Sequence, residues 1–413
     1  MRFFGNVRVG PQTPPTISHA LPISLSSLKP HYTHLLFSTG CTIPTLHPAL
    51  PPSDRVIPAL SFVHWYTQHP SRPAPPPLDK AEHVSIIGQG NVALDVARML
   101  LTPPGILEKY DVPTSVLDVL DRSAVRHVSI VGRRGPLQAA FTTKELRELT
   151  ALPGASMIPL PHDIITPPTG TKLTRQQSRI LQLLQQGSLT AIPTHTSDST
   201  TSRKSWSLDF FRSPTCFTTD GQHLTLAHTA LDEHSRAVPT GASSLLRTDL
   251  VITALGHHSD PLLAYYDPSL GHLCTDHRRR VLDATNRALR HVYASGWAAT
   301  GARGVLASTM IDAYAVAGTI LADHFGDGSG GGAEAVPVQD DAYSDGILVS
   351  DDVDLESVPK AVEQGMREKR VVEYDQWKKL DVEEIRRGAE RGKERERMGW
   401  DEVHEFLTNA RAW

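Results

Sequence analysis

The feature that most constrains this chain is a glycine-rich turn between a short apolar run and an amphipathic stretch. Residues 83–87 read HVSII, residues 88–93 read GQGNVA, and residues 92–101 read VALDVARMLL. This is the G-x-G-x-x-G/A pattern in the strand–turn–helix context that a dinucleotide site requires. It predicts a strand, a tight turn and a helix within a parallel α/β sheet.

Each small residue of the turn has a physical role in such a site. Gly88 permits the tight turn, Gly90 lets the backbone approach a pyrophosphate, and Ala93 lets the helix pack closely on the strand. The start of the helix then offers backbone N–H groups and a partial positive charge to the phosphates. The alternative is a glycine-rich turn that binds no ligand.

A pair of arginines follows the next apolar run and indicates which dinucleotide is bound. The run covers residues 127–131, is followed by Gly132-Arg133-Arg134-Gly135, and leads to an amphipathic stretch over 141–149. An NAD site expects an acidic residue at this position, whereas arginine binds the 2′-phosphate of NADP through charge-assisted contacts. Arg133 and Arg134 therefore favour NADP(H), unless they are ordinary surface arginines.

Asp95 has two interpretations. It lies in the first predicted helix, where an apolar residue would be less costly. Either it is an exposed helical aspartate, or it faces the cleft and orients a reacting group or holds a proton there.

A second glycine-rich turn covers residues 296–306 (GWAATGARGVL), between a predicted strand at 292–295 and an apolar helix at 305–321. The helix start near Gly304, Val305 and Leu306 is suited to aim backbone donors at a second cofactor. The alternative is again a turn without a ligand.

Other segments are predicted with less detail. Residues 34–40 read as a buried parallel strand closed by glycine, and the proline-rich residues 70–77 read as a linker. We also expect a helix at 176–186 and strands at 205–211, 222–231 and 249–255. Residues beyond 356 are charged and helical, which is typical of a solvated helix pair or of a tail that docks a partner.

Composition excludes several classes of function. The chain has 41 basic and 45 acidic residues, a balance that argues against nucleic-acid binding. Its three cysteines and 20 histidines show no metal-binding spacing. No apolar run approaches the roughly 20 residues that span a bilayer, so we expect at most peripheral membrane association.

Taken together, the motifs resemble one family, the mitochondrial adrenodoxin reductases, also called NADPH–ferredoxin reductases, with their fungal relatives. The resemblance extends over residues 1–325 and is most specific in 85–149. The matching stretches are RFFGNVRVG (2–10), SIIGQGNVALDVARMLLTPPGIL (85–107), VGRRGPLQAAFTTKELREL (131–149) and GWAATGARGVLASTM (296–310).

The resemblance implies an enzyme that takes hydride from NADPH onto FAD and passes single electrons to an acidic, adrenodoxin-like iron–sulfur ferredoxin. It implies a mitochondrial location, although the N-terminus reads as the interior of a domain and shows no presequence. The implied docking residues for the ferredoxin are Arg126, Arg133 and Arg147. The implied NADP residues are Gly88, Gln89, Gly90, Asn91, Val92, Arg133, Arg134 and Glu145. The implied FAD residues are Trp297, Gly304, Val305 and Leu306. The implied catalytic residue is Asp95, which would belong to the polar pathway near the flavin and the partner.

The chain departs from the family pattern in two places. No second G-x-G-x-x-G occurs, so the founding βαβ unit that would hold the ADP half of FAD is missing, and we expect an N-terminally truncated product. The turn after Trp297 lacks the Lys-Arg-Gly-Pro-Thr-Gly of the family. An NADP(H)-binding remnant without flavin or activity is therefore the alternative function; a related flavoenzyme with iron–sulfur motifs would need more cysteines.

The expected fold is α/β, with two doubly wound dinucleotide-binding domains. The NADP domain is inserted into an FAD domain that lacks its first βαβ unit. The expected ranges are 1–80 for a partial FAD domain and linker, 81–249 for the NADP-binding domain, 250–325 for the continuation of the FAD domain, 326–350 for a flexible linker and 351–413 for a charged helical C-terminal segment.

Overall fold

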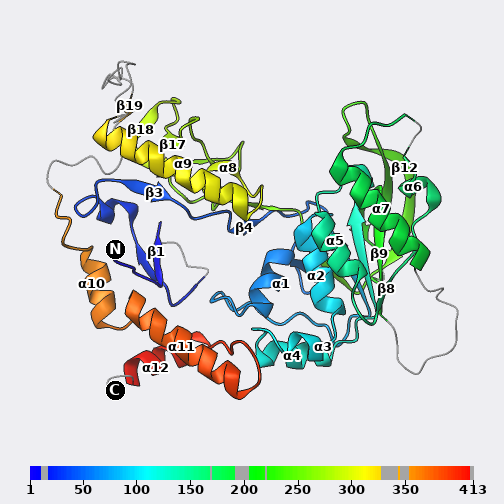
Figure 1. Cartoon of the computed structure of the whole chain (residues 1–413), viewed down its shortest axis with the longest axis horizontal. Helices are drawn as coiled ribbons and strands as arrows, with labels where there is room; N and C mark the ends of the chain where they lie inside the picture. Colours follow the sequence, from blue (N-terminus) through cyan, green and yellow to red (C-terminus); the bar gives the residue numbers. More distant parts are fainter. Residues whose placement is uncertain are drawn as a thin grey trace. The chain divides into compact units, whose positions relative to one another are not determined.

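A computed structural model of the chain describes residues 1–10, 17–167, 170–190, 204–218, 221–326, 343–344 and 353–409 (Figure 1). The chain divides into two compact units. Unit 1 contains residues 1–45, 256–381 and 400–413, and unit 2 contains residues 46–255 and 382–399. Unit 2 is thus inserted into the chain of unit 1, and both units mix helices with parallel strand pairing, which confirms the expected fold class.

Unit 2 is built on a six-stranded, entirely parallel sheet. The glycine-rich turn follows the strand at 83–87, which lies in the middle of the sheet with a neighbour on each side. In order across the sheet, the strands are β5 (Val56–Pro58), β13 (Leu250–Thr253), β6 (His83–Ile87), β7 (His127–Gly132), β9 (Lys204–Phe210) and β8 (Ala155–Met157).

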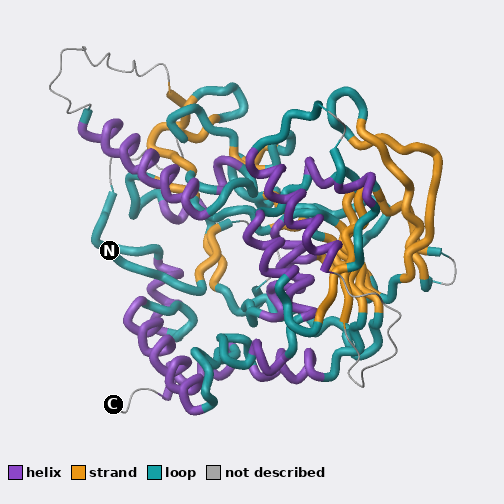
Figure 2. The backbone as a smooth tube through the Cα atoms, turned by 45° about the vertical axis from the view of Figure 1, so that its right-hand side comes forward, coloured by secondary structure: helices purple, strands orange, loops and turns teal. Residues whose placement is uncertain are grey.

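Helices cover one face of this sheet (Figures 1 and 2). Alternate strand residues such as Val84, Ile86, Val128 and Ile130 point to that face and form the main core with the helices. The helices of unit 2 are α1 (Ala59–Tyr66), α2 (Asn91–Leu101), α3 (Pro104–Leu107), α4 (Thr114–Asp121), α5 (Thr143–Thr150), α6 (His162–Ile165) and α7 (Arg175–Thr190), with a short 3-10 turn η2 (Pro136–Gln138).

An antiparallel three-stranded sheet contributes to the core on the other face. Its strands are β10 (Arg212–Phe217), β11 (His223–Leu231) and β12 (Ala237–Arg247). Leu224 and Leu226 of β11 form a second apolar cluster with Ile87, Val131 and Val251 of the parallel strands. Both faces of the central strands are therefore buried, which explains their continuous apolar sequence.

The structure agrees with the strand, turn and helix expected at 83–101 and differs from expectation elsewhere in unit 2. Residues 1–80 were expected to be a partial FAD domain and linker, but β5 and α1 add to the sheet and core of unit 2. β10 and β12 were not expected, because Pro214, Pro239 and Gly241 break the period-2 pattern of these strands.

Unit 1 carries smaller sheets. Its longest strand, β18 (Ala288–Ala294), pairs in parallel with β3 (Leu35–Phe37). The expected strand at 34–40 forms, but Leu36 is exposed, so it is only half-buried. The remaining strands are β1 (Val7–Val9), β2 (Leu21–Ile23), β4 (Ile43–Pro44), β14 (His257–His258), β15 (Tyr266–Asp267), β16 (His272–Leu273), β17 (Arg280–Leu282) and β19 (Tyr343–Ser344).

The helices of unit 1 include one long element after β18. They are α8 (Trp297–Thr300), α9 (Leu306–Phe325), α10 (Lys360–Arg367), α11 (Tyr374–Glu390, which continues into unit 2) and α12 (Trp400–Asn409), with a 3-10 turn η1 (Leu25–Leu28). Apart from Gly326 and residues 343–344, the expected linker at 326–350 lies outside the described residues. No helix in the described ranges combines the length and apolar character needed to cross a membrane.

The charged C-terminal segment returns to unit 2 and docks there. The Glu396 carboxylate accepts from the backbone N–H (3.1 Å) and the hydroxyl (3.0 Å) of Thr114, the first residue of α4. Lys393, whose side chain is 2% exposed, bonds to Glu396 and to the Val112 carbonyl (2.7 Å). Residues 382–399 are therefore a packed part of unit 2, which neither expectation for this segment had included.

Candidate dinucleotide-binding sites

The turn after β6 has the geometry that its glycines predicted. Gly88 has φ +127°, and a Cβ there would lie 2.2 Å from the carbonyl oxygen of Ala254. No other residue fits this position without moving the backbone. Gly90 precedes α2 in an extended conformation, and a Cβ there would meet no atom within 4 Å. The backbone at Gly90 is thus open to a close-approaching ligand.

The other residues of the turn are held in place by the neighbouring strand and helix. The Gln89 side chain packs where a Cβ of Gly132 would be, and its Nε2 is buried with no hydrogen-bond partner among the described residues. The Asn91 side-chain oxygen accepts from the Thr142 N–H (2.8 Å), which ties the start of α2 to the start of α5. Val92 packs against the core. An unpaired buried donor beside an open backbone fits a phosphate-bearing ligand.

Arg133 and Arg134 lie at the carboxyl end of β7, with exposed side chains. The β10–β12 sheet holds their backbone: Thr229 Oγ1 donates to the Arg133 carbonyl (2.8 Å), and the Phe211 N–H donates to that of Arg134 (3.4 Å). The loop is therefore fixed while both guanidinium groups stay available to an anion. This support was not predictable from sequence, because Thr229 lies 96 residues beyond Arg133 along the chain.

A histidine that the sequence analysis did not single out stands beside this arginine pair. Burial, and then the charge of Arg133, hold the pKa of His47 below its ordinary value. His47 is three residues from Leu50, which packs in the same cluster as Ile87 and Val131. The loop that carries His47 therefore packs, through Leu50, against Ile87 and Val131. Ile87 lies just before the Gly88 turn, and Val131 lies just before the loop that carries Arg133 and Arg134.

Asp95 and Glu145 come together in the structure. Asp95, one turn into α2, pairs with Arg98 at 2.6 Å, and Arg98 is 3.7 Å from the Glu145 carboxylate of α5. Burial raises the pKa of Asp95, and the neighbouring Glu145 raises it further, while Arg98 opposes both. Asp95 is thus a half-buried member of a charged cluster rather than an isolated exposed aspartate.

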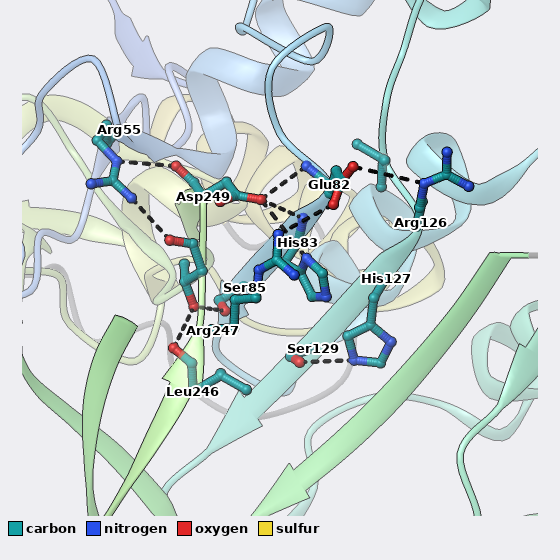
Figure 3. A network of polar contacts seen from close by, with 12 residues as sticks. Arg55, Glu82, His83, Ser85, Arg126, His127, Ser129, Leu246, Arg247 and Asp249 are labelled. Carbon is teal, nitrogen blue, oxygen red and sulfur yellow. Dashed lines mark hydrogen bonds and ion pairs between the residues drawn. The ribbon is translucent and has the colours of Figure 1, made fainter. Parts of the chain in front are cut away.

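The opposite, amino-terminal edge of the sheet is closed by a structural network (Figure 3). The Asp249 carboxylate accepts from the backbone N–H groups of Glu82 and His83, both at 2.9 Å. Arg55 donates to the backbone carbonyls of Thr248 and Asp249. Asp249 and Arg55 thus pair with backbone groups at this edge, whereas ligands of parallel sheets generally bind at the opposite, carboxyl edge.

The three arginines expected to dock an acidic partner do not form one patch. Arg126 precedes β7, beside Glu82, whereas Arg133 follows it. A six-residue strand spans roughly 20 Å. Arg147 is exposed on α5. The structure therefore separates Arg126 from the other two.

The second glycine-rich turn, in unit 1, is held by a carboxylate. Asp312 of α9 accepts from the Gly296 N–H (2.7 Å), from Ser295 (3.2 Å) and from the Arg279 guanidinium (2.7 Å). Gly296 has φ +60°. The turn therefore depends on a charged group in the helix that follows it.

Trp297, Gly304, Val305 and Leu306 meet at the start of α9. The Trp297 Nε1 donates to the Arg303 carbonyl (3.0 Å), Gly304 has φ +89°, and Val305 and Leu306 are exposed. Exposed apolar side chains beside the N-terminus of a 20-residue helix fit a flat aromatic ring system with a polar edge.

Comparisons with known proteins agree with this geometry. The chain is 34% identical to human mitochondrial NADPH:adrenodoxin oxidoreductase, over 96% of the chain and 76% of the human protein. It is 31% identical to the probable mitochondrial NADPH:adrenodoxin oxidoreductase of Schizosaccharomyces pombe, over 78% of the chain and 68% of that protein. No protein-family model matches the chain.

A solved structure shares the fold. Mycobacterium tuberculosis FprA in complex with NADPH superposes with a TM-score of 0.76 at 26% identity, covering 98% of this chain and 83% of FprA. At 98% coverage of this chain, the likeness extends over residues of both units.

Proposed function

The chain belongs to the NADPH:adrenodoxin oxidoreductase family, a family of enzymes, and on this premise we propose that it transfers electrons from NADPH through FAD to a small iron–sulfur ferredoxin. The observation that carries the proposal is the open backbone at Gly90 together with the two exposed arginines at the end of the next strand. That combination suits a pyrophosphate and a 2′-phosphate on one ligand.

In this proposal the residues of unit 2 bind and orient NADPH. Gly88 to Val92 and the start of α2 hold the pyrophosphate, and Arg133 and Arg134 hold the 2′-phosphate. Glu145 contacts the nicotinamide nucleotide, and Asp95 beside it is the proposed catalytic residue, whose carboxylate lies near the reacting ring. The Arg98 contacts with both carboxylates support placing them in one functional group.

In unit 1, Trp297 and Gly304 to Leu306 are proposed to contact FAD. When bound, this cofactor supplies the change from two-electron to one-electron transfer. The chain's own residues shield and orient it: Trp297 and the apolar side chains exclude water, and the backbone N–H groups at the start of α9 face its polar edge.

The partner and the location extend the proposal. We propose an acidic ferredoxin of the adrenodoxin type, docked by exposed arginines such as Arg147 through charge complementarity. The relatives named above are mitochondrial, which supports a mitochondrial location for this chain.

The NADPH site is tested by binding of 2′,5′-ADP and 5′-AMP, which differ only in the 2′-phosphate. Loss of one charge-assisted contact costs about 1.5–3 kcal/mol, so Arg133→Gln should weaken 2′,5′-ADP binding roughly 10- to 100-fold and leave 5′-AMP unchanged. Arg126→Gln removes the same charge from the other end of β7 and should change neither. Equal affinities of the wild-type chain for both nucleotides would refute the NADP assignment.

The flavin and the reaction are tested separately. A purified chain that carries FAD absorbs near about 450 nm and should reduce an adrenodoxin-like ferredoxin with NADPH. A chain that binds 2′,5′-ADP but takes up no FAD, even when FAD is supplied, would instead support the alternative of an NADP(H)-binding protein without flavin.

A further inference from the structure

One arginine in unit 2 contacts three carboxylates, and the proposed function leaves it without a role. Arg98 of α2 pairs with Asp95 on its own helix (2.6 Å) and with Glu145 of α5 (3.7 Å). Its guanidinium also contacts Glu148, one turn after Glu145. A guanidinium is a planar fork of five donors, so it can hold several carboxylates at once in fixed positions.

The charges around this arginine do not balance. Asp95, Glu145 and Glu148 bring three negative charges, and Arg98 and Lys144 bring two positive ones, which leaves one negative charge in excess. Lys144 is 3.9 Å from Glu148 on the solvent side. Asp95 and Glu145 both lie against the Arg98 guanidinium, Asp95 at Nη2 and Glu145 at Nη1. Two carboxylates that share one guanidinium repel each other, and the cation between them offsets that repulsion.

The third side of the cluster is formed by α1. Tyr66 lies close to Asp95 and Arg98, and burial, followed by the charge of Asp95, raises the pKa of its hydroxyl to about 12. Tyr66 is therefore a neutral hydroxyl in the functional pH range and does not offset the negative charge. Among the described groups that face the Asp95–Glu145 pair, Arg98 is the cation in direct contact with both members.

We propose that Arg98 is a positioning residue that holds Asp95 and Glu145 on one guanidinium and keeps Asp95 ionised at neutral pH. Glu148 contacts the same guanidinium and so weakens the effect of Arg98 on Asp95. The inference rests on the proposed function, in which this pair adjoins the nicotinamide. An ionised pair favours the positively charged ring of NADP⁺ over the neutral ring of NADPH. Arg98 thereby sets the relative affinity for the two redox states.

The direct test is a carboxyl ¹³C NMR titration of the full chain, labelled at aspartate and glutamate. In Arg98→Gln, the pH at which Asp95 takes up its proton should rise by at least about one unit, the usual effect of an adjacent arginine. Glu148→Gln should lower that pH, because Arg98 then contacts only the carboxylates of Asp95 and Glu145. Arg98→Lys keeps the charge and should restore most of the wild-type value.

A matched control and a second readout separate positioning from stability. Arg147→Gln removes the same charge from the exposed side of α5 and should leave the titration unchanged. The ratio of NADP⁺ to NADPH affinity should fall about tenfold in Arg98→Gln at pH 7 and recover at higher pH. If Arg98→Gln lowers the melting temperature but leaves the titration as in wild type, Arg98 is only structural and the inference fails. The 2′,5′-ADP test of the proposed function is independent of either result.

Discussion

Helices α2 and α9 both begin after a glycine-rich turn that follows a parallel strand, yet they differ in how they are held. Seven of the 11 residues of α2 are buried. Of the 20 residues of α9, Val316 is the one that the described part of the chain buries. Leu306, Ile311 and Tyr314 of α9 are exposed. The same local sequence pattern thus produces a core helix in one unit and a surface helix with an apolar face in the other.

The difference teaches that the strand–glycine–helix pattern specifies the turn and not the packing behind it. At α2, the second face of the sheet, the neighbouring helices and the arginine loop all support the turn. At α9, the turn is fastened mainly by one carboxylate, Asp312. Three pairs of matched substitutions test this contrast.

The largest difference is expected for leucine truncation. Leu100 in α2 is 1% exposed and Leu321 in α9 is 57% exposed. Leu100→Ala should destabilise unit 2 by about 2–5 kcal/mol, because it removes buried methyl groups and leaves a cavity. Leu321→Ala should change the stability of unit 1 by less than about 0.5 kcal/mol. Hydrogen exchange of peptides from each helix, combined with denaturant titration, measures the stability change of each variant. Equal losses in Leu100→Ala and Leu321→Ala would contradict the contrast between the two helices.

The next difference concerns the glycines of the two turns, both with positive φ. A Cβ at Gly88 meets the backbone oxygen of Ala254, while a Cβ at Gly304 meets the movable hydroxyl of Ser308 at 2.5 Å. Gly88→Ala should cost at least about 1–3 kcal/mol and abolish nucleotide binding, since the backbone must shift. Gly304→Ala should cost less. Thermal unfolding compares the stability losses of the two variants. A larger loss in Gly304→Ala than in Gly88→Ala would contradict the prediction.

The smallest and most pH-dependent difference concerns the aspartates. Burial acts to raise the pKa of Asp312, but the Gly296 N–H and Arg279 outweigh it and hold that pKa below its ordinary value. Its stabilisation is therefore present above about pH 4, the unfolded value, and is lost as pH falls through the lower folded pKa. Asp312→Asn should cost about 1–3 kcal/mol at pH 7 by weakening bonds to a charged acceptor.

Asp95 is expected to behave in the opposite way. Its pKa is raised, first by burial, so its ionisation above about pH 4 destabilises the folded state instead of stabilising it. Asp95→Asn should therefore change stability at pH 7 by less than about 0.5 kcal/mol. Denaturant unfolding at pH 7 and at pH 4 provides the measurement, and a large loss at pH 7 in Asp95→Asn would show that its Arg98 contact outweighs the repulsion.

Much of unit 2 was predictable because its local signals agree with one another. The run at 83–87 forms a strand with those bounds, and the helix expected at 92–101 begins one residue earlier. Glycines at 88 and 90 fix the turn through backbone conformation, which sequence reports directly. Arg133 and Arg134 occupy the expected end of β7 because strand length alone determines where they emerge.

What could not be predicted depends on partners far away in the sequence. His47 reaches Arg133 through a loop with no periodic pattern, and Arg98 gains its role from Glu145 and Glu148 on another helix. The apolar residues of α9 predicted a helix correctly, but such a pattern cannot report whether a neighbour covers them. β12 was not expected, because Pro239 and Gly241 interrupt its period-2 pattern.

The docking of Glu396 on α4 has a consequence for how the chain folds during synthesis. Thr114 and its acceptor Glu396 are 282 residues apart, so at roughly 5–20 residues per second the ribosome adds the acceptor tens of seconds after the helix it caps. Until then the N-terminus of α4 has no side-chain cap of its own, because Pro113 precedes it. The contacts that residues 382–399 make with unit 2 can therefore form only after the rest of that unit has been synthesised.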